Sequence, residues 1–135
     1  MAPLSSVSML FLKRIALLKK MKLPNGARAV VEIGKLRDYC LSAQHPEGRH
    51  KARVFLSALG MAAQDAGGLR EILLSAAVNS PMASVTSSDE YGCRYSVDMV
   101  VSWGSRAALV RSAWIIKTGE DFPRLVSCYV LRGDA

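Results

Sequence analysis

The sequence has few of the side chains on which most enzyme chemistry depends. It contains only two histidines and three cysteines, with no CxxC pair and no spacing typical of a zinc site. Glycine-rich phosphate loops, the G-x-S-x-G nucleophile motif and the H-E-x-x-H motif are also missing. These absences argue against a nucleotide-dependent enzyme, an α/β-hydrolase and a zinc peptidase. We therefore expect no cofactor and no metal.

A long apolar run is missing as well. Met9–Leu12 is interrupted by Lys13 and Arg14, so it is far shorter than the roughly 18 residues that a membrane span requires. Cys40, Cys93 and Cys128 are far apart and lie in apolar segments. This arrangement is typical of buried, reduced thiols in a cytoplasmic protein. We expect a cytoplasmic location and no membrane span.

Acidic residues are absent from the first twenty positions, which hold four of the 18 basic residues. The remaining 14 basic and 11 acidic residues leave +3 of the total charge of +7 on the rest of the chain. We interpret residues 1–20 as a basic, disordered extension, with a short amphipathic helix as the alternative. Residues 21–135 are expected to form a single domain. Binding of a polyanion would then depend on a local cluster of charge.

The apolar pattern divides this domain into a helical half and a strand-rich half. Helices are predicted over Lys35–Leu41, from about Ala52 to Gly60, and after an N-cap at Asp65. The period then changes to two, which predicts an edge strand and three further strands at Met82–Ser88, Cys93–Trp103, Arg106–Lys117 and Arg124–Leu131. Short turns make these strands antiparallel. The fold class is therefore α+β, with N-terminal helices packed on one face of a C-terminal antiparallel meander.

One candidate site is the stretch HPEGRHKARVF, His45–Phe55. Its Pro/Gly loop is expected to expose His45 and Arg49 and to lead into a helix that begins near His50. The positive end of a helix favours an anion, and Lys51 and Arg53 add charge. A histidine there can transfer a proton near neutral pH, as phosphodiester cleavage requires. An ordinary solvated turn remains the alternative.

A second candidate lies on the last two strands. Arg111 interrupts an apolar strand, and Ser127 and Tyr129 extend together from one face of the last strand, opposite Val126 and Cys128. A cation beside two hydroxyls can hold a phosphate and stabilise developing charge. An Asp98–Arg111 ion pair on a half-exposed sheet is the other interpretation, and the pattern does not choose between them.

The segments LPNGARAVVEIGKLRDYCL, HPEGRHKARVFLSALG, YGCRYSVD and VRSAWIIKTGEDFPRLVSCYVL resemble a small bacterial domain family of unknown function, over roughly Lys22 to Leu131. A basic histidine near a helix start and a Ser-x-Tyr on the last strand are similar to a wider superfamily. That superfamily unites barnase, the EndoU nucleases, the tRNA-cutting colicins and the RelE-type toxins. Where its sheet often carries Thr-x-Tyr, this chain has Ser127.

The second resemblance implies His50 as general acid or base, Lys51 and Arg111 as phosphate contacts, and Ser127 and Tyr129 as orienting or proton-relaying groups. It also implies a metal-independent endoribonuclease, the toxin of a toxin–antitoxin pair, with tRNA or mRNA as substrate and a small neutralising protein as partner. His45, Arg49 and Arg53 would add RNA contacts. The competing hypothesis is a non-catalytic interaction protein, such as an antitoxin, an immunity factor or an RNA-binding accessory.

Overall fold

The computed structural model describes residues 19–131. The extension predicted over residues 1–20 lies almost entirely outside the described residues. Short helical segments and longer helices come first, and four strands follow. The helical segments are η1 (Gly26–Arg28), α2 (Ile33–Lys35), the π-helical turn η2 (Leu36–Cys40), α3 (Arg49–Leu59), η3 (Ala63–Asp65) and α4 (Ala66–Asn79).

The strands form one antiparallel meander in the order β1 (Ala83–Asp89), β2 (Gly92–Trp103), β3 (Arg106–Lys117) and β4 (Arg124–Val130). The period-two pattern of β2 reflects burial, because Tyr95, Val97 and Val101 are buried while Val100 is 70% exposed. The short turn Gly104-Ser105 joins β2 to β3, which requires these two strands to run antiparallel. The predicted α+β fold is confirmed.

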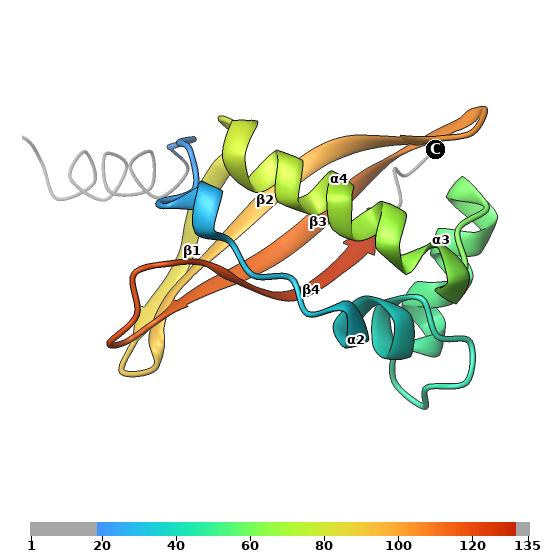
Figure 1. Cartoon of the computed structure of the whole chain (residues 1–135), viewed down its shortest axis with the longest axis horizontal. Helices are drawn as coiled ribbons and strands as arrows, with labels where there is room; N and C mark the ends of the chain where they lie inside the picture. The colour runs from blue at the N-terminus through green and yellow to red at the C-terminus, as the bar shows by residue number, and fades with distance from the viewer. Residues whose placement is uncertain (1–18, 132–135) are drawn as a thin grey trace, which may run out of the picture.

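The helices cover one face of this sheet. Figure 1 shows α4 lying across the strands, with α2 and α3 gathered at one end of the sheet. The core between the two layers includes Phe55, Leu69, Leu73, Val101 and Trp114, all almost fully buried. Burial of such side chains contributes about 1.5–3 kcal/mol each, which is why the amphipathic stripes of α3 and α4 settle on the sheet. Helix α3 packs against β3 and β4, and this contact positions the site described below.

Three local expectations were wrong or incomplete. Val126 is 43% exposed, because the β3–β4 register shifts between Ala113 and Trp114 and leaves Val126 as an extra residue in β4. Asp65 does precede α4, but its carboxylate accepts a hydrogen bond from the Ala62 N–H at 3.0 Å instead of capping that helix. The sequence of Ala29–Ile33 is typical of a short strand, but in the structure it forms only a single bridge, from Val30 to Arg124.

Candidate functional site

The loop before α3 is built around His45. Its Nδ1 accepts hydrogen bonds from the backbone N–H groups of Glu47 at 3.0 Å and Gly48 at 2.9 Å. Its ring meets the edge of Tyr39 at a centroid distance of 4.7 Å. A Cβ at Gly48 would lie 2.2 Å from the Tyr39 carbonyl oxygen, so only glycine fits there. His45 is therefore half-buried and shapes the loop, whereas the sequence predicted an exposed side chain.

Helix α3 and strand β4 together form a pocket, which we call the α3–β4 pocket. It has a volume of about 310 Å³ and is lined by His50, Lys51, Val54, Tyr129 and Val130. His50 is exposed, and Lys51 and Tyr129 are half-buried. The imidazole and the phenol, which lie 79 positions apart in the sequence, thus share one solvent-reachable opening.

Lys51 is the central cation of this pocket. Its Nζ donates a 2.8 Å hydrogen bond to Ser127 Oγ. The same ammonium lies 5.0 Å from the ring centroid of Tyr39 and 5.7 Å from that of Tyr129. Two aromatic faces attract a positive charge, and the serine oxygen accepts a hydrogen bond from the ammonium. These contacts suit an ammonium that holds an anion and do not suit an amine that removes a proton from Ser127.

Arg111 lies beside Tyr129 as its direct cross-strand partner. Its guanidinium donates two hydrogen bonds to Asp98, from Nε at 2.7 Å and from Nη2 at 2.8 Å. This bidentate pair raises the pKa of Arg111 and lowers the pKa of Asp98, and the neighbouring phenol of Tyr129 raises the pKa of Arg111 further. The expected Asp98–Arg111 ion pair is therefore present, and Nη1 is the guanidinium nitrogen that Asp98 leaves unused.

A pair of thiols lies behind Lys51. Cys40 and Cys128 are both buried, and Cys40 Sγ lies 3.8 Å from Ser127 Oγ. The hydrogen bond from Cys128 lowers the pKa of Cys40 to about 6 against the opposing effect of burial, with further help from Ser127 and Lys51. The same contact and burial raise the pKa of Cys128. The contact between the two thiols and the nearby Lys51 ammonium therefore both favour the thiolate form of Cys40.

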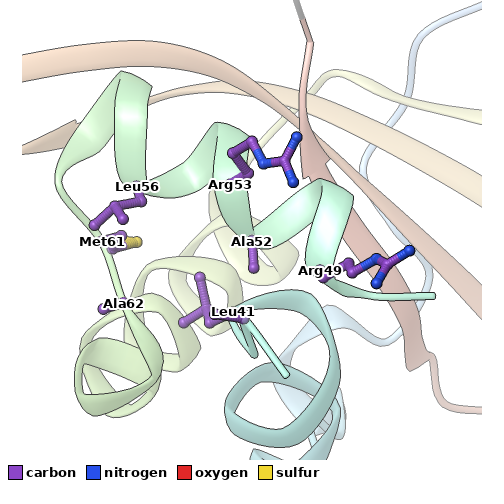
Figure 2. Close-up of a pocket in the computed structure, with 8 residues that line it drawn as sticks. Leu41, Arg49, Ala52, Arg53, Leu56, Met61 and Ala62 are labelled. Atoms are coloured by element: carbon purple, nitrogen blue, oxygen red, sulfur yellow. The ribbon is translucent and has the colours of Figure 1, made fainter. Parts of the chain in front are cut away.

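Arg49 and Arg53 lie elsewhere. They share the face of α3 that carries Ala52 and Leu56, and they line a separate cavity (Figure 2). At 100° per residue, this face is nearly opposite the one that presents His50 and Lys51. Of the predicted residues, His50, Lys51 and Tyr129 line the α3–β4 pocket, while Ser127 is hydrogen-bonded to Lys51 and Arg111 is the cross-strand partner of Tyr129. The structure keeps Arg49, Arg53 and the loop residue His45 out of the α3–β4 pocket.

Sequence reasoning missed Tyr39 and Cys40 as members of the site. Both lie in the segment predicted as a helix over Lys35–Leu41, and a helical pattern carries no information about which strand the helix meets. Among residues 19–131, no group of three or more His, Cys, Asp or Glu side chains is arranged to hold a metal ion. No helix within that same part of the chain is long and apolar enough to cross a bilayer.

Fold and site together define a small α+β domain with a basic pocket where a helix start meets the edge of a meander. The chain belongs to the family described as "Domain of unknown function (DUF6883)", whose model matches residues 22–132. The family resemblance seen in the sequence is thereby confirmed. No curated protein matches the chain. The more distant resemblance to ribonuclease toxins stays a prediction.

Proposed function

We propose that the protein is a metal-independent endoribonuclease that acts in the cytoplasm as the toxin of a toxin–antitoxin pair. One observation carries the proposal: His50, Lys51 and Tyr129 line the same open pocket, with Arg111 paired across the strand from Tyr129. An imidazole, a cation and a phenol at one solvent-reachable position are the groups that RNA transesterification uses. RNA supplies its own nucleophile, the 2′-OH, so few protein groups suffice.

The proposed reaction assigns one role to each side chain. His50 takes the proton of the 2′-OH, and the 2′ oxygen forms a bond to the adjacent phosphorus while the bond from phosphorus to the 5′ oxygen breaks. The leaving 5′ oxygen takes a proton from Tyr129. Lys51 stabilises the charge on the phosphoryl oxygens, and Ser127 orients Lys51 through their 2.8 Å hydrogen bond. The products are a 2′,3′-cyclic phosphate and a free 5′-OH.

Arg111 acts in this scheme mainly through Tyr129. Because Asp98 occupies two guanidinium nitrogens, the charge of Arg111 is largely compensated before any phosphate arrives. A cation next to the phenol still stabilises the phenolate that forms when Tyr129 gives up its proton. Arg111 is therefore a positioning residue for Tyr129, with Nη1 left for a phosphate oxygen.

The test is cleavage of RNA by the purified protein in the presence of a chelator, with the products separated by mass. We expect 2′,3′-cyclic phosphate ends, and no cleavage where the 2′-OH is replaced by hydrogen. His50→Ala and Tyr129→Phe should each lower the rate by about 10²–10⁴-fold, the usual contribution of a general acid or base. Lys51→Met should lower it as well, while Arg53→Met, on the same helix but outside the pocket, is the matched charge control.

Expression in cells provides the second readout. We expect expression of the wild type to arrest growth and His50→Ala to relieve the arrest without loss of folded protein. That result supports the toxin role, which also requires a small neutralising partner protein. Absence of cleavage and of growth arrest with folded wild-type protein refutes the enzyme. Equal loss of activity in Lys51→Met and Arg53→Met would show that general positive charge, and not the pocket, is responsible.

A non-catalytic interaction protein is the second candidate, and two contacts favour it. Asp98 already compensates Arg111, and His45 is engaged by the backbone of its loop, so one histidine remains for proton transfer. Such a protein would bind RNA or a partner protein without altering it. RNA binding that depends on Lys51, with no cleavage at any pH, would identify this function.

A further inference from the structure

The second cavity of α3, which we call the arginine pocket, is lined by Leu41, Ala43, Arg49, Ala52, Arg53, Leu56, Met61 and Ala62. Its volume is about 290 Å³, close to the lower end of the range for small-molecule sites. Leu41, Ala52 and Met61 are buried and form an apolar floor. In Figure 2 the two guanidinium groups lie on one side and Leu56, Met61 and Ala62 on the other. The lining is therefore apolar on one side and cationic on the other.

Arg49 and Arg53 differ from the other arginines of residues 19–131. Six of those pair with carboxylates, namely Arg28, Arg37, Arg70, Arg94, Arg111 and Arg124. Arg106 donates to backbone carbonyls of α3. Within the same residues, Arg49 and Arg53 have neither kind of partner. One turn apart on a helix, their Cβ atoms lie about 5–6 Å from each other, so both guanidinium groups can reach one anion.

None of the residues that line the arginine pocket is acidic. No acidic residue occurs in the first turn of α3, and none occurs anywhere in Arg49–Leu59. The carboxylate of Asp65, in the following turn, accepts a hydrogen bond from the N–H of the lining residue Ala62 and forms no ion pair with Arg49 or Arg53. The positive end of the α3 dipole acts in the same direction as the two arginines.

We propose that the arginine pocket binds a small amphipathic oxyanion, that is, a carboxylate or a phosphate monoester joined to a short apolar body. The apolar body lies on Leu41, Ala52 and Met61, and the oxyanion is held by Arg49 and Arg53. Guanidinium groups recognise both head groups through paired N–H donors. The pocket lies on the opposite face of α3 from His50 and Lys51, so this proposal does not depend on the ribonuclease proposal.

RNA is the competing occupant, and the floor of the pocket argues against it. A phosphodiester backbone contacts cationic and polar surface, whereas the buried part of this cavity consists of aliphatic and thioether groups. A carboxylate or phosphate alone would leave the apolar side chain of Leu56, which is 55% exposed, in water. Only a ligand with both parts uses the apolar and the cationic side together.

The experiment titrates the full chain, labelled with ¹³C on its methionine methyl groups, with hexanoate, hexyl phosphate, hexan-1-ol and hexylamine. The methyl signal of Met61, assigned from Met61→Leu, reports occupation of the floor. We expect both anions to shift it saturably, and the alcohol and amine to bind at least about tenfold more weakly, since they lack the charge-assisted bonds. Comparing the two anions shows which head group the site prefers.

Two variants separate the two halves of the pocket. Arg49→Gln with Arg53→Gln should weaken hexanoate binding at least about tenfold while leaving the floor intact. Ala62→Leu, at a half-buried lining position, should block binding with both charges retained. Arg37→Gln, at an exposed arginine paired only with Asp38, is the matched control and should bind like the wild type.

Three results would overturn the proposal. The first is the absence of a saturable Met61 shift with either anion. The second is equal affinity for hexan-1-ol and hexanoate, and the third is unchanged hexanoate affinity in the double arginine variant. A single-stranded RNA that displaces hexanoate and itself shifts Met61 would assign the pocket to RNA instead. Thermal unfolding of each variant distinguishes loss of the site from loss of the fold.

Discussion

Lys51 is the residue that connects the two halves of the chain chemically. Its hydrogen bond to Ser127 spans 76 positions, and its aromatic neighbours come from the turn η2 and from strand β4. The sequence marked Lys51 as a cation at a helix start, which is a local property. Its partners are set by how α3 packs on the sheet, and no local pattern contains that information.

The Cys40 thiol is expected to ionise at a lower pH than an ordinary thiol, because its contacts in the folded protein lower its pKa to about 6. The ultraviolet absorbance of thiolate should therefore rise near pH 6 in the folded protein, and Cys40→Ser should remove that rise. Lys51→Met should move it to higher pH, since a nearby cation favours the thiolate. Lys117→Met, at an exposed position, should leave it unchanged.

The same ionisation links stability to pH. The pKa of Cys40 is lower in the folded chain than in the unfolded one, so folding favours the thiolate. The contribution of Cys40 ionisation to the free energy of unfolding is complete above about pH 9. It declines as the pH falls toward 6 and is lost below about pH 6. Urea unfolding should show this slope in the wild type and a flatter curve in Cys40→Ser. Identical curves would mean that Cys40 stays protonated.

At the scale of elements, strands were easier to predict than the turns and bulges that orient them. Cys93–Trp103 alternates between apolar and polar residues except at Val100, and Arg106–Lys117 is a mostly apolar run between two turns; the structure matches the predicted bounds of both nearly to the residue. The inward–outward alternation of β4 is broken at Val126, which has no partner in β3. This extra residue moves the residues before it to the opposite face of the sheet. Ser127 and Tyr129 still share one face, since the shift lies ahead of them. This part of the candidate site was therefore predictable.

Gly67 and Gly68 of α4 are expected from the sequence to weaken the helix equally, but the structure places them in different surroundings. A Cβ at Gly67 would have no neighbouring atom within 4 Å, whereas a Cβ at Gly68 would lie 2.3 Å from the Trp103 ring. Gly67→Ala should raise the free energy of unfolding by about 0.5–1 kcal/mol through helix propensity. Gly68→Ala should lower it by about 1–3 kcal/mol, because Trp103 must move. Chemical denaturation measures both, and equal effects would contradict this packing.

At the scale of the whole molecule, the charge distribution limits how the protein can hold a polyanion. Most described arginines are paired with carboxylates, so the domain presents isolated cations and not a continuous basic stripe. Affinity for RNA must then come from a few contacts at one place. That expectation distinguishes a pocket-based ribonuclease from a protein that coats RNA.

Salt dependence of RNA binding measures the number of these contacts. With Lys51 as a full phosphate contact and Arg111 as a contact that Asp98 largely compensates, the logarithm of the binding constant should fall with the logarithm of salt concentration at a slope between about −0.7 and −1.4, since each full contact to single-stranded RNA contributes about −0.7. A 2′-O-methylated oligonucleotide prevents cleavage during the measurement. Lys51→Met should reduce the slope by about 0.7. Arg53→Met and removal of residues 1–20 should leave it unchanged, whereas a slope of about −3 or steeper would mean that RNA follows α3 to Arg49 and Arg53 or reaches the N-terminal residues.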